Sequence, residues 1–213
     1  MPLKSSLGAF VAFLLISSAP FARGNMIRFD FGQNAGSTGG NVPDVTAVFS
    51  DVGPNQVNLT ITATDFSGGN SIKALFFNFN PAFDVTGLTF TQIAPVGGVQ
   101  GDVRLANNSF KASGGGKFDI KIDFSSSPFI TGNTLVYSIT GVGPFSVNDF
   151  AFPNTPSAGH PLSYAAGSIQ DLSQVVIVNG SPSPVPDAAS TAGILGFAML
   201  TLFSFRNSKR FAA

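Results

Sequence analysis

The chain of 213 residues lacks several residue types on which enzyme and metal sites commonly depend. It has no cysteine, no glutamate and no tryptophan, and its one histidine is His160, next to Pro161. Without cysteine there is no disulfide, no thiol nucleophile and no cysteine-ligated metal. A single histidine has no obvious partners for a zinc site or a catalytic triad, so the plainer interpretation of His160 is a loop residue.

Strong helix formers are also scarce, whereas Phe, Val, Thr, Gly, Asn and Ser are frequent. This composition is typical of strands and Gly-rich turns rather than helices. Residues 25–180 are enough for one core of ordinary size. Their six basic side chains and ten Asp give a net charge of −4, which disfavours nucleic acid and anionic membranes as partners.

Hydrophobic alternation predicts strands along this region. In 117–124, Phe118, Ile120, Ile122 and Phe124 fall on one face, and Lys and Asp fall on the other. That pattern predicts a strand with one buried and one solvated face. Residues 57–64 and 27–31 alternate in the same way.

Less regular strands are expected at 45–50, 72–80, 86–92, 103–110, 134–140 and 174–178. The stretch 72–80 is apolar on both faces, as expected of a central strand. Prolines interrupt 150–173, which is expected to be a long loop with at most one short strand. We therefore predict an all-β fold, an antiparallel β-sandwich of Greek-key or jelly-roll type.

The first 24 residues have the features of a secretory signal peptide. Lys4 supplies the positive end, Leu7 to Ile16 form a short apolar stretch, and Ala22 and Gly24 mark a small-residue site for signal peptidase. The sequence therefore predicts that residues 25–180 form a domain outside the cytoplasm.

The C-terminal end has a second targeting pattern. A Ser/Pro segment, 181–184, is predicted to be a linker that cannot join a sheet. Residues 188–205 carry no charge and would span about 27 Å as a helix, just short of a bilayer core of about 30 Å. Arg206, Lys209 and Arg210 follow, which predicts a transmembrane helix with a basic cytoplasmic tail at 206–213.

The residues before this span resemble a known sorting signal. Val185, Pro186 and Asp187, with Ser190 and Thr191, resemble the VPDSG variant of the PEP-CTERM signals of exopolysaccharide-producing Gram-negative-type bacteria. The resemblance covers 185–213 and implies recognition and cleavage by an exosortase, with transfer of the ectodomain to a surface component. Ala188 and Ala189 stand where Gly or Ser is usual. An uncleaved single-span anchor is the alternative.

Other candidate sites are weak. Asp119 and Asp123, four residues apart on one strand face, would be about 13 Å apart, too far for a glycosidase pair, and are interpreted as solubilising charges. Asp44 and Asp51 could contribute to a calcium loop, but no Asp-x-Asp-x-Asp-Gly pattern is present, so no metal or other cofactor is predicted.

The sequence thus predicts a non-enzymatic, exported surface or matrix protein of structural or adhesive type, processed by signal peptidase and exosortase. The alternative is a carbohydrate- or calcium-binding, lectin-like adhesin that stays anchored by its C-terminal helix. Exopolysaccharide is a candidate partner. The absence of Trp, and the presence of only Tyr137 and Tyr164, weigh against a strongly stacking sugar site.

Overall fold

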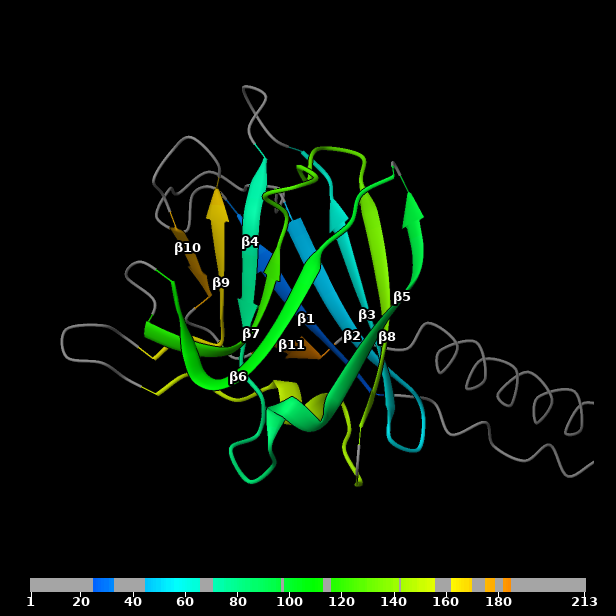
Figure 1. Cartoon of the computed structure of the whole chain (residues 1–213), viewed down its shortest axis with the longest axis vertical. Coiled ribbons are helices and arrows are strands. Elements are labelled where there is room, and N and C mark those ends of the chain that lie inside the picture. Colours follow the sequence, from blue (N-terminus) through cyan, green and yellow to red (C-terminus); the bar gives the residue numbers. More distant parts are fainter. Residues whose placement is uncertain are drawn as a thin grey trace, which may run out of the picture.

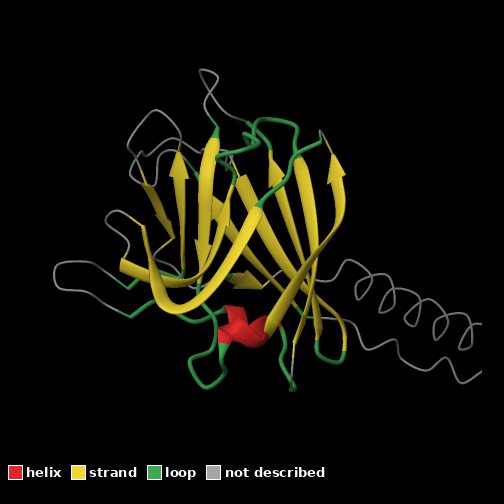
Figure 2. Cartoon of the chain, viewed as in Figure 1, coloured by secondary structure: helices red, strands yellow, loops and turns green. Residues whose placement is uncertain are grey.

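The computed structural model describes residues 25–32, 45–65, 71–96, 98–112, 116–141, 143–155, 162–169, 175–178 and 182–184. These residues form an all-β structure of two antiparallel sheets, with two short 3-10 turns, η2 (Val85–Gly87) and η3 (Val147–Phe150) (Figures 1 and 2). The predicted signal peptide, the sorting signal at 185–213, His160 and Asp44 lie outside the described residues. Within the described part, no helix has the length and apolar character needed to cross a membrane.

One sheet has six strands in the order β11-β1-β2-β3-β8-β5, and the other has five in the order β10-β9-β4-β7-β6. In chain order the strands are β1 (Met26–Phe31), β2 (Val45–Gly53), β3 (Gln56–Ala63), β4 (Ile72–Phe77), β5 (Leu88–Val96), β6 (Asp102–Ala112), β7 (Gly116–Asp123), β8 (Thr134–Gly141), β9 (Ala165–Ile169), β10 (Val175–Val178) and β11 (Ser183–Pro184).

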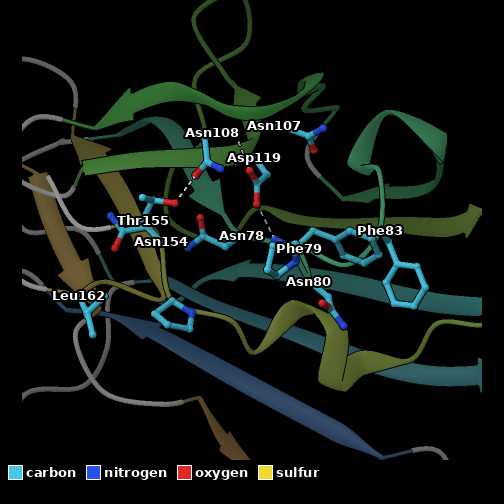
Figure 3. Close-up of a pocket in the computed structure, with 12 residues that line it drawn as sticks. Asn78, Phe79, Asn80, Phe83, Asn107, Asn108, Asp119, Asn154, Thr155 and Leu162 are labelled. Atoms are coloured by element: carbon cyan, nitrogen blue, oxygen red, sulfur yellow. Dashed lines mark hydrogen bonds between the residues drawn. The ribbon is translucent and has the colours of Figure 1, made fainter.

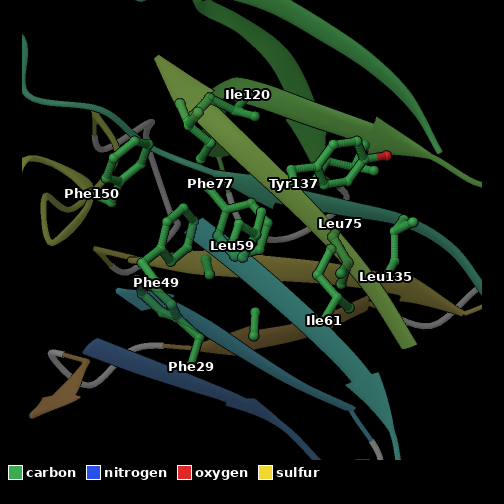
Figure 4. Packing of buried hydrophobic residues seen from close by; sticks show 14 of the residues in the cluster. Phe29, Phe49, Leu59, Ile61, Leu75, Phe77, Ile120, Leu135, Tyr137 and Phe150 are labelled. Atoms are coloured by element: carbon green, nitrogen blue, oxygen red, sulfur yellow. The ribbon is translucent and has the colours of Figure 1, made fainter. Parts of the chain in front are cut away.

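The main core lies between the two sheets. Every second residue of β3 is buried, as the alternation predicted. β4 lies at the centre of its sheet, also as predicted, and sends Phe77 toward the six-stranded sheet, where it contacts Phe29, Phe31 and Phe49 edge-to-face (Figure 4). The two apolar sheet faces therefore bury one another.

A second, smaller cluster lies on the outer side of the five-stranded sheet. Phe76, whose neighbours Leu75 and Phe77 enter the main core, points to the opposite face and contacts Phe118 of β7. The prediction that Phe118 shares the main core face of β7 is therefore wrong. The β6–β7 register breaks between Leu105 and Phe110, and a break of this kind bends the strands. Figure 1 shows the strong curvature of β6, and at this end of the hairpin Phe118 contacts Phe76 of β4.

The prediction that the Ser/Pro segment stays out of the sheet is also wrong. Ser183 and Pro184 form β11, which pairs with Arg28 and Ile27 of β1 at the edge of the six-stranded sheet. Proline lacks a backbone donor, but an edge strand needs partners on one side only, so proline is tolerated there. The predicted loop at 150–173 does contain one short strand, β9, as expected.

Candidate functional site

A pocket of about 490 Å³ opens where the end of β4 meets the bent β6–β7 hairpin and the segment that leads to β9 (Figure 3). Its volume is in the range of small-molecule sites in proteins. Amide side chains dominate its polar lining, and the acidic lining residue is Asp119. The lining residues are Asn78, Phe79, Asn80, Pro81, Phe83, Asn107, Asn108, Asp119, Pro153, Asn154, Thr155 and Leu162.

Asn78 directly follows β4, and its side chain is only 2% exposed. Its Nδ2 donates to two backbone oxygens, those of Ser163 and Tyr164, at 3.2 Å each. A carbonyl oxygen can only accept, so these two bonds fix which end of the amide is nitrogen. The Asn78 Oδ1 therefore faces away from those carbonyls, toward Asn108 and Thr155 in Figure 3, and it has no hydrogen-bond partner among the described residues.

Asp119 of β7 is 8% exposed, so the prediction that it is a solubilising surface charge is wrong. Its Oδ2 accepts from the Phe79 N–H at 3.0 Å, and its Oδ1 accepts from the Asn108 N–H at 2.7 Å. The carboxylate thus connects the end of β4 to the irregular part of β6. Its burial follows from the bent hairpin, which covers a face that a straight strand would leave in water.

Asn108 lies in that irregular part of β6, with φ at 48°. Asn is one of the few side chains that tolerate this left-handed conformation. Its Oδ1 accepts from the Thr155 hydroxyl at 2.8 Å, which joins the hairpin to the segment before β9.

Gly116 allows the same two segments to approach closely. Its φ is +86°, and a Cβ atom there would lie 2.2 Å from the Nδ2 of Asn154. Asn154 in turn accepts from the Ser163 N–H through its Oδ1 at 2.9 Å. The side-chain amides of Asn78 and Asn154 therefore hold this wall of the pocket through hydrogen bonds to the backbone.

The apolar part of the pocket is formed by aromatic and aliphatic side chains at different depths. Phe79 is 4% exposed, whereas Phe83 and Leu162 are 38% and 50% exposed at the rim. The Phe79 and Phe83 rings are 6.1 Å apart. The site thus combines buried hydrogen-bonding groups with apolar surface that is open to a ligand.

The carboxylates of the described residues serve mainly as acceptors for the chain itself. Burial alone would raise the pKa of Asp123, but hydrogen bonds from Lys121 and Ser125 outweigh it and lower that pKa to about 2. A general acid in glycoside hydrolysis needs the opposite shift. Several Asp side chains accept a hydrogen bond from a backbone N–H group: Asp51 from Val147, Asp84 from Thr86, Asp119 from Phe79 and from Asn108, Asp123 from Ser125, and Asp149 from Ser146.

Several predicted site residues can now be placed. Asp51, considered for calcium, uses its Oδ1 to accept from the Val147 N–H, and its suggested partner Asp44 is outside the described residues. The described residues contain no group of three or more His, Cys, Asp or Glu side chains that could hold a metal ion. The residues predicted for targeting also lie outside the described part of the chain. They are Ala22, Gly24, Val185, Pro186, Asp187, Ser190, Thr191, Arg206, Lys209 and Arg210.

Sequence reasoning missed the pocket. The signal for it was a concentration of Asn at strand ends, in Asn78-Phe79-Asn80 and Asn107-Asn108. Asn in such positions is usually a turn former, so its convergence on one pocket is visible only in the fold.

A scan against protein-family models finds none that matches this chain. A search of curated proteins likewise finds no match. Among solved structures, the chain is similar to a family 3b carbohydrate-binding module from the biomass sensoring system of Clostridium clariflavum, with 13% identity over 73% of this chain and 95% of that chain. The TM-score of this match is 0.33, which is too low to transfer a fold family or a ligand to this chain.

Proposed function

We propose that this chain is an exported, non-catalytic surface or matrix protein whose sandwich binds extracellular polysaccharide. The observation that carries this proposal is the amide-lined pocket with the Oδ1 of buried Asn78, which has no hydrogen-bond partner in the part of the chain that the structure describes. The carboxylate among the described lining residues, that of Asp119, accepts backbone N–H bonds on both of its oxygens. The site therefore favours holding a ligand over breaking a bond in it.

Sugars suit such a site because each hydroxyl can both donate and accept a hydrogen bond. Side-chain amides offer both functions in one group. The exposed ring of Phe83 offers apolar surface to the C–H face of a sugar, although the chain has no tryptophan for this purpose. Amide groups together with one exposed Phe ring support a weak, adhesive interaction with a sugar.

The test is a sedimentation assay of the full chain with insoluble polysaccharides and with exopolysaccharide from its own cells. We expect the protein to sediment with at least one of them, and we expect no release of reducing sugar on long incubation. Failure to bind any polysaccharide overturns the proposed binding function. Release of reducing sugar by the protein, absent from a heat-inactivated sample, overturns the non-catalytic assignment.

A second proposal concerns how the protein reaches the surface. The sequence observation behind it is the order of motif, uncharged span and basic tail at 185–213, together with the signal-peptide features of 1–24. In this proposal signal peptidase removes the signal peptide, the predicted C-terminal helix holds the precursor in the membrane, and an exosortase recognises Val185, Pro186 and Asp187. Mapping the C-terminus of the protein recovered from its cells distinguishes this route from a permanent anchor.

A further inference from the structure

We propose that the pocket around Asn78 is the polysaccharide site and that it binds an uncharged sugar unit, one of whose hydroxyls donates to the Asn78 Oδ1. This inference rests on the proposed function, because it names the site and the ligand class for polysaccharide binding. It goes further in excluding acidic sugars and metal-mediated binding.

The Asn78 amide has a fixed orientation. Its nitrogen is held by the backbone oxygens of Ser163 and Tyr164, so the amide cannot rotate to present a donor to the pocket. The oxygen is buried, belongs to a residue that lines the pocket and has no partner among the described residues. A buried acceptor without a partner is energetically costly, and a ligand donor would remove that cost. The ligand must therefore bring a hydrogen-bond donor to this point.

The charge of the pocket determines which sugars that carry a hydrogen-bond donor are favoured as ligands. Asp119 lines it, while no lysine or arginine is among its described lining residues. Lys117 pairs with Thr155 through an isolated bridge, but Lys117 is exposed and does not line the pocket. An anionic sugar such as a uronate would bring its carboxylate near Asp119 without a cation to compensate. Uncharged sugars carry hydroxyl donors and avoid this repulsion.

A metal ion is the competing ligand, because it would also be attracted to exposed oxygens. Calcium takes six to eight oxygen ligands and is usually held by several carboxylates. Here the carboxylate is that of Asp119, and both of its oxygens already accept backbone N–H bonds. The Asn108 Oδ1 is likewise occupied by the Thr155 hydroxyl. The oxygen atoms of the pocket therefore suit a ligand hydroxyl better than a metal cation.

The shape of the site indicates which part of a polymer enters. The polar groups Asn78 and Asp119 are nearly buried, and Phe83 and Leu162 stand exposed at the rim. An extended chain lying across the surface would reach the rim but not the Asn78 Oδ1. A chain end or a branch can enter the pocket, so the proposed ligand is a terminal or branching unit.

The experiment measures binding of the full chain in a detergent without a sugar head group, since glycoside detergents would compete. Isothermal titration uses neutral monosaccharides and short oligosaccharides against matched uronates, with and without a chelator. We expect at least one neutral sugar to bind, its uronate counterpart to bind at least tenfold more weakly, and the chelator to have no effect.

Two variants change the pocket with little risk to the fold. Asn108→Gly removes the amide but suits the left-handed backbone and keeps the N–H that donates to Asp119. Phe83→Ser removes an exposed rim ring. Each should weaken sugar binding about three- to tenfold, the range of one hydrogen bond or one small apolar contact. Asn78→Leu removes the central acceptor and should abolish binding, with thermal melting recorded because two backbone carbonyls lose their donor.

Asn58→Ala is the matched control, because Asn58 Oδ1 is also a buried oxygen without a partner in the described structure but lies on β3, away from the pocket. It should leave binding unchanged. The inference is overturned if Asn108→Gly and Phe83→Ser both bind as wild type does, if uronates bind equally well, or if the chelator abolishes binding. If both pocket variants still sediment with polysaccharide, the proposed function stands. If the wild-type protein binds no polysaccharide, the proposed function and this inference are both overturned.

Discussion

Asp119 shows what a periodic pattern can and cannot establish about a single residue. The alternation in 117–124 correctly put Ile120 and Ile122 in the core, because period-two alternation determines which way side chains point. It could not show that the opposite face of β7 is covered near Asp119, since that depends on the bend in the β6–β7 hairpin. Burial of a polar side chain is a property of the fold around it rather than of its own strand.

The first prediction concerns this carboxylate. Asp119→Ala leaves two backbone N–H groups without their acceptor, those of Phe79 and Asn108. We expect the free energy of unfolding to fall by about 2–4 kcal/mol, because losing a buried, charge-assisted acceptor is costly. Urea unfolding followed by circular dichroism measures the change.

Asp102→Ala is the control for that experiment. Asp102 pairs with Arg104, but the two side chains are 58% and 57% exposed. An ion pair this exposed contributes less than about 1 kcal/mol. Equal losses in the two variants would show that the buried bonds of Asp119 contribute no more than a surface charge does.

At the scale of elements, the sequence located the strands with a strong or moderate hydrophobic pattern, but it did not place β9 or β11. β1, β3 and β7 alternate cleanly, and β4 is apolar on both faces, so each could be recognised. One short strand was expected within 150–173, but its sequence, Ala-Ala-Gly-Ser-Ile, has no alternation that would have placed it at β9. β11 is only Ser-Pro, and it is a strand because β1 offers it an edge, which no local pattern encodes.

The second prediction follows from the position of β11. Its last residue, Pro184, pairs with Ile27, and the proposed sorting motif begins at the next residue, Val185. Cleavage before Ser183 would remove β11 and uncover the edge of β1, whereas cleavage within 185–191 keeps the sheet complete. We therefore expect the C-terminus of the mature protein to lie within 185–191. Intact mass measurement and C-terminal peptide mapping of protein from its own cells determine it.

An Asp187→Ala variant in the same cells is the control, and it should retain residues 206–213. If the wild-type protein also retains them in the membrane fraction, the exosortase proposal fails and a permanent anchor remains. A mature terminus upstream of Ser183 would instead show that β11 is not part of the processed protein.

For the whole molecule, the sequence was sufficient to predict two antiparallel sheets but not their strand order. Many short strands with one apolar face must bury that face, and a second sheet is the simplest way to do so. The order places β8 between β3 and β5, although many residues separate β3 from β8 in the chain. Such long-range pairing depends on how all strands fit together, and hydrophobic alternation is the same for many arrangements.

The last prediction tests whether the space between the sheets is the main source of stability. Phe77 and Phe76 are neighbours on β4, and both are nearly fully buried, at 0% and 5% exposure. Phe77 contacts Phe29, Phe31 and Phe49 across the sandwich, whereas the ring contact of Phe76 is with Phe118 on the outer side. Phe77→Ala should lower the free energy of unfolding by about 3–5 kcal/mol, the cost of a large cavity in a core.

Phe76→Ala is a matched control of the same residue type on the same strand. We expect it to cost about half as much, because the smaller outer cluster can collapse around the lost ring more easily than two opposed sheets can. Urea unfolding of the two variants side by side decides the matter. Equal costs would mean that the bent β6–β7 hairpin packs on β4 as firmly as the second sheet does, and that the wall of the Asn78 pocket is as rigid as the sandwich itself.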